Sequence, residues 1–134
     1  MGQELMPIYL VTGGAGFIGS HIVETLLCRG EQVRVLDNFS TGKRANLAHL
    51  TGLDLIEGDI RDVELVRTAT RGVDCVIHQA ALVSVTQSMA EPELCHAVNV
   101  TGTLNILEAA RDFNVRRVVL ASSCAVYGDN DDLP

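Results

Sequence analysis

Long apolar runs are missing from this sequence of 134 residues, as are other features that would assign it to a particular class of protein. No stretch approaches the ~20 consecutive apolar residues that a membrane-spanning helix needs, so we expect no membrane association. The segment Met1–Met6 has neither a basic region nor an apolar core, which argues against a signal peptide. Because 47% of the residues are hydrophobic, we expect one globular domain over residues 1–134.

Positively charged side chains are scarce as well. The chain has 10 Lys and Arg against 17 Asp and Glu, which gives a formal net charge of −7. Such an excess of negative charge repels phosphate backbones and anionic lipid headgroups. We therefore expect neither nucleic acid nor a membrane surface as a partner.

The cysteines and histidines lack the spacings that metal sites and redox motifs use. The four cysteines lie far apart and form no C-x-x-C, and the four histidines show no zinc-ligand spacing. Reduced, mostly buried thiols are typical of a cytoplasmic protein. We expect a cytoplasmic location and no metal site.

What the sequence does contain is a glycine-rich stretch between an apolar strand and a helix. Residues 8–12 are apolar or β-branched, and an apolar pattern with helical spacing begins after the glycines. Gly13 allows a sharp turn, Gly16 removes a Cβ that would keep a pyrophosphate away, and Gly19 lets the helix lie close to the strand. The N–H groups of the first helical turn, at the positive end of the helix dipole, then face an anion. This pattern predicts a dinucleotide site.

The second predicted strand ends in the carboxylate of Asp37. This residue lies 18 positions after Gly19, where the dinucleotide fingerprint places the acid that accepts from a ribose 2′-hydroxyl. In the polar loop that follows, Lys43 and Arg44 could hold the 2′-phosphate of NADP, or be a solvated pair that opens a short helix through Leu50. Because Asp37 would repel that phosphate, the sequence favours NAD over NADP.

The rest of the chain alternates strands with helices. Asp62 is a typical N-cap for one helix, and a long helix is predicted from about Pro92 to Phe113. A short acidic tail at 129–134 follows the last strand. The alternation predicts an α/β fold, a Rossmann-type doubly wound parallel sheet with strand order 3-2-1-4-5, truncated after the fifth strand. The further strands are expected at 53–58, 73–78 and 116–123. The inward-facing residues of the long helix are expected to be Leu94, Val98, Leu104, Leu107, Ala110 and Phe113.

Several polar or small residues in this alternation point to contacts. Asn99 lies among apolar neighbours in the long helix, and because buried amides usually have partners, it is either an internal clamp or a cofactor contact. Gly102 costs a helix interior about 1 kcal/mol relative to alanine and indicates close packing. Asp59 and Ile60 follow the third strand at the edge where ligands bind in open α/β sheets, although Asp59 as a simple turn residue stays open.

Six short motifs in matching order make the chain similar to a known family. It resembles the extended short-chain dehydrogenase/reductases, in the NAD-dependent epimerase/dehydratase branch, and within it the UDP-glucose and UDP-N-acetylglucosamine 4-epimerases. The likeness covers essentially the whole chain but only the N-terminal, cofactor-binding part of such an enzyme. The motifs are Thr12-Gly13-Gly14-Ala15-Gly16-Phe17-Ile18-Gly19, Asp37-Asn38, Gly58-Asp59-Ile60, His78-Gln79-Ala80-Ala81, Asn99-Val100-Thr101-Gly102-Thr103, and Ser122-Ser123 with Val126-Tyr127-Gly128.

The resemblance implies a role for each matching position. The backbone of Phe17 and Ile18 would contact the pyrophosphate of NAD, and Asp59 with Ile60 would flank the adenine. Ser123 would be the catalytic hydroxyl, which hydrogen-bonds the 4-oxygen of the sugar during hydride transfer. The full set of expected cofactor-binding residues is Gly13, Gly16, Phe17, Ile18, Gly19, Asp37, Asn38, Ser40, Thr41, Gly42, Asp59, Ile60, Gln79, Ala80, Ala81, Val83 and Asn99.

Two departures from the family pattern bear on the reaction. Cys124 and Ala125 stand where the 4,6-dehydratases of this branch carry an Asp-Glu pair, so the resemblance disfavours a dehydratase. Val83 stands where some UDP-glucose epimerases carry a lysine. With valine at this position, the loop more closely resembles that of the epimerases that accept N-acetylated sugars.

The catalytic Tyr-x-x-x-Lys of the family does not occur in these 134 residues. The only tyrosines are Tyr9 and Tyr127, and neither has a lysine four positions later. In the family, the tyrosine takes the 4-hydroxyl proton while hydride moves to NAD, and the lysine lowers the pKa of that tyrosine. We therefore expect this polypeptide alone to be inactive.

Three interpretations follow from the resemblance. The chain is the NAD-binding portion of a nucleotide-sugar 4-epimerase that acts on a UDP-sugar through a 4-keto intermediate, or a non-catalytic NAD-binding module. An NADP-dependent reductase is disfavoured by Asp37. Because the fifth strand and part of the long helix would be uncovered, we also expect a homo-oligomer.

Overall fold

Five parallel strands form one sheet in the computed structural model, which describes residues 6–129. Their order is β3-β2-β1-β4-β5, so the predicted Rossmann-type α/β fold and strand order are confirmed. Our predictions for the segment before Met6 and for the acidic tail after Asp129 concern residues outside this range. The strands are β1 (Ile8–Thr12), β2 (Gln32–Asp37), β3 (Leu53–Glu57), β4 (Cys75–His78) and β5 (Arg117–Leu120).

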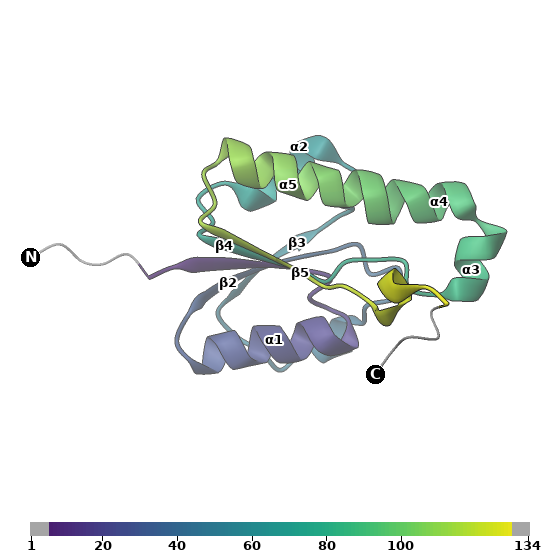
Figure 1. Ribbon diagram of the computed structural model, residues 1–134. Coiled ribbons are helices and arrows are strands. Elements are labelled where there is room, and N and C mark those ends of the chain that lie inside the picture. Colours follow the sequence, from purple (N-terminus) through teal and green to yellow (C-terminus); the bar gives the residue numbers. More distant parts are fainter. Residues whose placement is uncertain (1–5, 130–134) are drawn as a thin grey trace, which may run out of the picture.

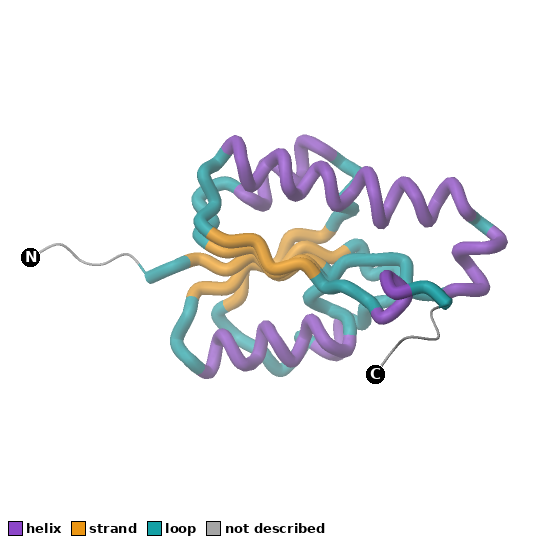
Figure 2. Tube along the Cα trace, in the orientation of Figure 1, coloured by secondary structure: helices purple, strands orange, loops and turns teal. Residues whose placement is uncertain are grey.

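Helices cover the two faces of the sheet unequally (Figure 1). One long helix, α1, runs beneath the sheet, while α2 and the continuous run of α4, η2 and α5 lie above it; Figure 2 shows the same three layers. The carboxyl ends of the strands are at the right of Figure 1, together with α3. The helical elements are α1 (Phe17–Cys28), η1 (Arg44–Asn46), α2 (Val63–Thr70), α3 (Val85–Ala90), α4 (Pro92–His96), η2 (Ala97–Gly102), α5 (Thr103–Asp112) and η3 (Cys124–Tyr127).

The core consists of two apolar clusters, one on each face of the sheet. Leu10 of β1 packs with Ile106 of α5 in one cluster, and Val11 of β1 packs with Val23 of α1 in the other. Successive strand residues point to opposite faces, so apolar side chains are needed on both faces of β1 before Thr12. This is why the sequence before the glycines reads as a continuous hydrophobic run.

One prediction about the long helix is wrong. We expected Leu104 and Leu107 to face inward, but their side chains are 51% and 39% exposed. The buried positions of this stretch are Gly102, Asn105, Ile106, Ala109 and Ala110, and the first two contact the loop after β3. A Cβ at Gly102 would lie 2.6 Å from the side chain of Ile60, and Asn105 Nδ2 donates to the carbonyl oxygen of Ile60 at 3.0 Å. The close packing predicted at Gly102 is confirmed.

Of the other helices, the start of α2 was predicted correctly and α3 was not predicted. Asp62 is the N-cap of α2 as expected, since its carboxylate accepts from the N–H of Leu65 at 3.1 Å. Helix α3 is absent from the elements expected from the sequence, although Ser84 and Gln87 have capping-box spacing. The Ser84 hydroxyl accepts from the N–H of Gln87 at 3.2 Å. No helix within residues 6–129 has the length and apolar character that crossing a membrane requires.

Candidate dinucleotide site

At two glycines of the turn between β1 and α1, the surrounding backbone leaves no room for a side chain. Gly13 has a φ of +67°, and a Cβ there would lie 2.7 Å from the backbone nitrogen of Ala80. A Cβ at Gly19 would lie 2.2 Å from the carbonyl oxygen of Gly13. At Gly16, the nearest atom to a Cβ is that same oxygen at 3.3 Å. The fold itself requires Gly13 and Gly19, whereas Gly16 leaves room for a group from outside the chain.

The first turn of α1 presents hydrogen-bond donors at this opening. Gly16 is the N-cap and has no side chain that could accept from them. The N–H of Ser20, which donates to the carbonyl oxygen of Gly16, is the first with an acceptor in the helix, so the N–H groups of Phe17, Ile18 and Gly19 have none there. This donor set, at the positive end of the helix, fits a pyrophosphate.

Asp37 joins the end of β2 to the glycine turn. Its side chain is largely buried, with 8% relative exposure for the residue. One carboxylate oxygen accepts from the N–H of Ala15 at 2.9 Å and the other from the N–H of Phe39 at 2.8 Å. The carboxylate therefore lies where the glycine turn and the loop after β2 meet, the place that an acceptor for a ribose hydroxyl needs.

The loop after β2 packs on the glycine turn and on the end of β3. A Cβ at Gly42 would lie 2.9 Å from the Cβ of Ala15. Asn38 Oδ1 accepts from the N–H of Ser40 at 3.0 Å, and Asn38 Nδ2 donates to Asp59 at 2.8 Å. Ser40 and its neighbour Thr41 are exposed. The structure thus brings together the residues predicted after β2 and those predicted after β3.

Asp59 has a defined set of partners at the end of β3. Arg61 donates to its two carboxylate oxygens at 2.9 and 2.7 Å. These hydrogen bonds hold the pKa of Asp59 well below its usual range, against the opposing effect of partial burial. The side chain of Ile60 is buried against Gly102, so only the backbone of Ile60 is available to a ligand at this edge.

A buried network fixes the start of the loop after β4. Thr12 Oγ1 accepts from the N–H groups of Gln79 and Ala80, both at 3.2 Å, which uses its two lone pairs. The hydroxyl proton of Thr12 is therefore donated to His78 Nδ1, 2.6 Å away. His78 Nε2 must then carry the ring proton, which it donates to Thr103 Oγ1 at 3.0 Å. Burial lowers the pKa of His78, in agreement with this neutral ring.

Asn99 fixes the next part of the same loop. Its Oδ1 accepts from the N–H of Leu82 at 2.8 Å, and its Nδ2 donates to the carbonyl oxygen of Leu82 at 2.9 Å. The internal clamp is confirmed, and a direct contact of Asn99 with a cofactor stays a prediction. Ala81 and Val83, on either side of the clamp point, are exposed.

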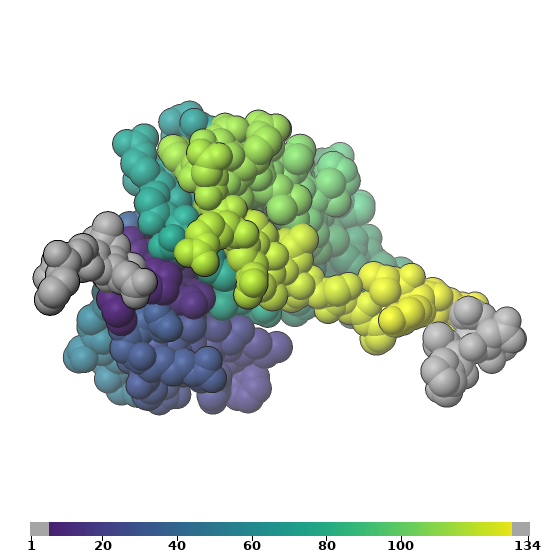
Figure 3. Space-filling model, turned by 60° about the vertical axis from the view of Figure 1, so that its left-hand side comes forward, coloured from purple at the N-terminus to yellow at the C-terminus, as the bar shows by residue number. Residues whose placement is uncertain are grey.

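Ser123 lies at the same carboxyl edge but belongs to a separate segment. Its hydroxyl accepts from the N–H of Ala125 at 3.2 Å and caps η3. Residues 119–129 are all exposed, and Figure 3 shows this segment, in yellow, projecting from the body of the molecule. The structure therefore joins the predicted cofactor residues after β1, β2, β3 and β4, whereas the segment of Ser123 stands apart from them.

Sequence reasoning missed the functional part that Thr12, His78, Thr103 and Asn105 play. None of these side chains is predicted to contact a ligand; each holds a loop of the site in place. Their hydrogen bonds join residues that are 25 to 68 positions apart in the sequence. The available signal was a polar side chain within an otherwise apolar segment. That signal shows that a partner is needed but does not identify the partner.

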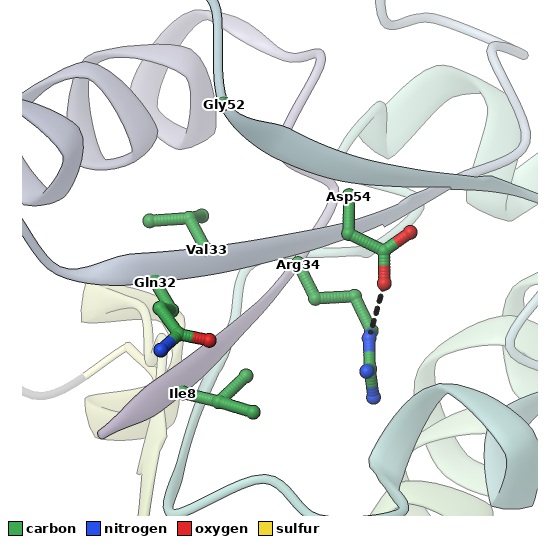
Figure 4. A pocket seen from close by; sticks show the side chains of 6 residues that line it. All are labelled: Ile8, Gln32, Val33, Arg34, Gly52 and Asp54. Carbon is green, nitrogen blue, oxygen red and sulfur yellow. Dashed lines mark hydrogen bonds and ion pairs between the residues drawn. The ribbon is translucent and has the colours of Figure 1, made fainter. Parts of the chain in front are cut away.

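The opposite, amino edge of the sheet carries a hollow, shown in Figure 4. Arg34 donates to Asp54 at 2.8 Å, and also to the carbonyl oxygens of Ala69 and Arg71. The charged groups of this hollow are thus engaged within the fold. Among residues 6–129, no group of three or more His, Cys, Asp and Glu side chains is placed to hold a metal ion. The hollow is lined by Ile8, Gln32, Val33, Arg34, Gly52 and Asp54.

The sheet order, the glycine turn after β1 and the acidic residue at the end of β2 define a Rossmann fold, the class of domain in which dinucleotides bind at this edge. The sequence profile of the NAD dependent epimerase/dehydratase family matches residues 9–134. The chain belongs to this family, which confirms the resemblance seen in its motifs.

Proteins similar to the chain include sugar-nucleotide epimerases. The chain is 43% identical to a UDP-glucose 4-epimerase of Streptomyces lividans, over 94% of this chain and 39% of the relative. It is 51% identical to a UDP-glucose 4-epimerase of Thermus thermophilus solved with NAD, with a TM-score of 0.81 over 87% of this chain and 37% of that one. A UDP-N-acetylglucosamine 4-epimerase from Methanobrevibacter ruminantium, solved with UDP-N-acetylmuramic acid, is 38% identical with a TM-score of 0.89, over 96% and 42%. The chain thus spans about two fifths of the length of these relatives.

Proposed function

We propose that this chain binds NAD at the carboxyl edge of its sheet and is the NAD-binding portion of a nucleotide-sugar 4-epimerase. The observation that carries the proposal is the opening at Gly16, where the donors of the first turn of α1 lie beside the buried carboxylate of Asp37. The pyrophosphate would be held by the N–H groups of Phe17 and Ile18, and the adenosine ribose by Asp37. The adenine would lie against the loop that contains Asp59.

The remaining part of the dinucleotide would run along the loop from Gln79 to Val83, which Thr12 and Asn99 hold in place. Small side chains at Ala80 and Ala81 permit its close approach. When bound, NAD supplies the acceptor for the hydride that leaves the sugar carbon. Ser123, exposed at the same edge, would hydrogen-bond the 4-oxygen of a UDP-glucose, UDP-galactose or N-acetylated UDP-sugar, with a 4-keto sugar as intermediate.

Calorimetric titration of the chain with NAD and with NADP tests the cofactor. We expect tighter binding of NAD, because Asp37 accepts from a 2′-hydroxyl and repels a 2′-phosphate. The Asp37→Ala variant should narrow the difference. Equal or tighter binding of NADP by the unaltered chain would refute the proposed cofactor.

We also propose that these 134 residues alone do not catalyse the epimerisation of a UDP-sugar. Support comes from the sequence, in which neither Tyr9 nor Tyr127 stands four positions before a lysine. Without such a pair, no group assists the removal of the 4-hydroxyl proton. Incubation with NAD and UDP-galactose or UDP-N-acetylglucosamine should leave the sugar unchanged, and turnover well above the uncatalysed rate would contradict this part.

We also propose that the chain associates with itself and resides in the cytoplasm. Val100, Leu104 and Leu107 are exposed along the long helix, and Val119 and Leu120 are exposed on β5. Apolar surface of this kind on a strand at the edge of a sheet favours pairing with a second copy. Light scattering at micromolar concentration should report a dimer or larger species, whereas a stable monomer would contradict the association. The four cysteines are free, which fits the proposed cytoplasmic location. The expectation that they are mostly buried is wrong, because Cys28 and Cys124 are exposed and Cys75 and Cys95 are only partly buried.

A further inference from the structure

The two cations of the loop after β2, Lys43 and Arg44, are held by different contacts. Lys43 is fixed through its backbone, whose N–H donates to the carbonyl oxygen of Ala15 at 3.0 Å. Arg44 is fixed through its side chain. Its Nη2 donates to the carboxylate of Glu57, and its guanidinium carbon lies 4.1 Å above the centre of the Phe39 ring. Of the two cations that could receive a 2′-phosphate, Arg44 is thus held by partners within the fold.

The partner of Arg44 stands beside the carboxylate that faces the adenosine end. Asp37 and Glu57 are directly paired in the β2–β3 ladder, the last pair before both strands end. Since side chains alternate along a strand, partners in such a pair point to the same face. Two carboxylates therefore stand side by side at this edge, Asp37 buried and Glu57 with its side chain 59% exposed.

Asp37, the first of these carboxylates, holds the backbone of Phe39, whose ring lies under Arg44. Phe39 has a φ of +56°, a left-handed conformation that is uncommon for an aromatic residue. Its N–H donates to Asp37 at 2.8 Å, which supports this conformation. Asp37, Phe39, Arg44 and Glu57 thus form one connected unit, in which the carboxylates determine where the guanidinium lies.

We propose that Glu57 is a specificity-determining residue that excludes NADP. By pairing with Arg44 and keeping it over Phe39, Glu57 withholds the guanidinium that would otherwise bind a 2′-phosphate. Arginine recognises phosphate through several N–H donors presented together, and a carboxylate bound to one of its nitrogens competes directly with that geometry. Glu57 also adds a second negative charge beside Asp37, well within the screening length of ~8 Å at physiological ionic strength. The inference rests on the proposed binding of NAD at this edge.

The test compares Glu57→Gln with a matched variant, Asp54→Asn. Asp54 is also on β3, is paired with an arginine, and has a side chain 60% exposed, but it lies at the amino edge of the sheet. Both variants remove one negative charge. NAD and NADP are titrated by calorimetry into the unaltered chain and into both variants, with thermal unfolding as a check of folding.

We expect Glu57→Gln to bind NADP about fivefold more tightly than the unaltered chain, the upper end of what a surface ion pair is worth. The affinity for NAD should change less than about twofold, and Asp54→Asn should leave both affinities unchanged. Adding Arg44→Gln to Glu57→Gln should abolish the gain, since the released guanidinium is what binds the phosphate.

Three results would overturn the inference: an unchanged ratio of affinities in Glu57→Gln, an equal gain in Asp54→Asn, or a gain that persists without Arg44. If NAD binds the unaltered chain and the ratio does not move, the role of Glu57 fails while the proposed function stands. If the unaltered chain binds neither nucleotide, both fail together.

Discussion

The loops that follow β1, β2, β3 and β4 are held by the chain itself, whereas the segment that follows β5 is not. Asp37 bonds to the glycine turn, Asn105 to the loop after β3, and Asn99 to the loop after β4. After β5, residues 121–129 are all exposed, and the Ser123 hydroxyl bonds within its own turn. The edge proposed to bind the dinucleotide is therefore ordered by contacts within residues 6–129, whereas the segment proposed to contact the sugar has few contacts that would fix it.

This difference predicts where substitutions will alter the free energy of unfolding. Segments with few buried contacts open at little cost in free energy, and buried, hydrogen-bonded segments open close to the cost of global unfolding. Substitutions in the first four loops should therefore affect the stability of the whole fold. Substitutions after β5 should not.

The largest loss of stability is expected when a methyl group is added at Gly19, in the first of the loops that the chain holds. We expect Gly19→Ala to lower the free energy of unfolding by about 3 kcal/mol, because its Cβ would lie 2.2 Å from a backbone oxygen, in spite of the better helix propensity of alanine. Urea unfolding measures the loss. A variant as stable as the unaltered chain would show that the turn is less rigid than its contacts indicate.

The matched control for Gly19 is Gly16→Ala. Its Cβ has its nearest contact at 3.3 Å, so we expect a stability cost below about 1 kcal/mol. NAD binding should nevertheless weaken at least tenfold (about 1.4 kcal/mol), because the methyl group would occupy the place proposed for the pyrophosphate. Unimpaired binding would contradict that placement.

A smaller effect is expected at Asn105, which ties α5 to the loop after β3. Asn105→Ala leaves the buried carbonyl oxygen of Ile60 without this donor, at a cost of about 2 kcal/mol. Glu108→Ala, on the exposed side of the same helix, is the control and should be close to neutral. Equal urea midpoints for the two variants would argue against the clamp.

The buried ring of His78 predicts a dependence of stability on pH. Burial lowers its pKa in the folded state, so below about pH 6.5 the unfolded chain binds the additional proton and the folded chain does not. Stability should therefore fall as the pH falls from about 6.5 toward 5, by at most about 1.4 kcal/mol for each pH unit. Urea unfolding at several pH values measures the slope, which His78→Gln should flatten in this window.

Acidic groups contribute in a different window. Hydrogen bonds from Arg61 lower the pKa of Asp59, and those from Arg67 and Arg111 lower the pKa of Asp112. The stability that these carboxylates contribute is present above their unfolded pKa of about 3.9 and is lost as the pH falls below it. A slope confined to that acidic range, with none between about pH 5 and 6.5, would contradict the neutral ring inferred for His78.

The smallest effect is expected in the segment after β5. Ser123→Ala removes a hydroxyl that caps a short exposed turn, so the free energy of unfolding should change by less than about 0.5 kcal/mol. Thermal and urea unfolding measure it. A loss comparable to that of Asn105→Ala would show that the two halves of the site are held alike.

Much of the fold could be predicted from the sequence because its signals are local. An apolar run that stops at glycines, a carboxylate at the end of the next strand, and strands alternating with helices all act over a few neighbouring residues. The wrong prediction that Leu104 and Leu107 face inward also came from relying on a local pattern. Their apolar side chains fit a helical stripe, but Gly102 and Asn105 are among the positions that are buried instead, because they contact a loop more than 40 residues earlier.

Residue type and spacing are enough to predict the parallel sheet, its strand order, the glycine turn after β1 and the family. The partners of the polar side chains, in contrast, follow from the assembled fold. The ring proton of His78 depends on Thr12, which lies 66 positions away, and the restraint of Arg44 depends on the pairing of two strands. Such contacts form between distant segments after the sheet has assembled, and no local pattern of residues encodes them.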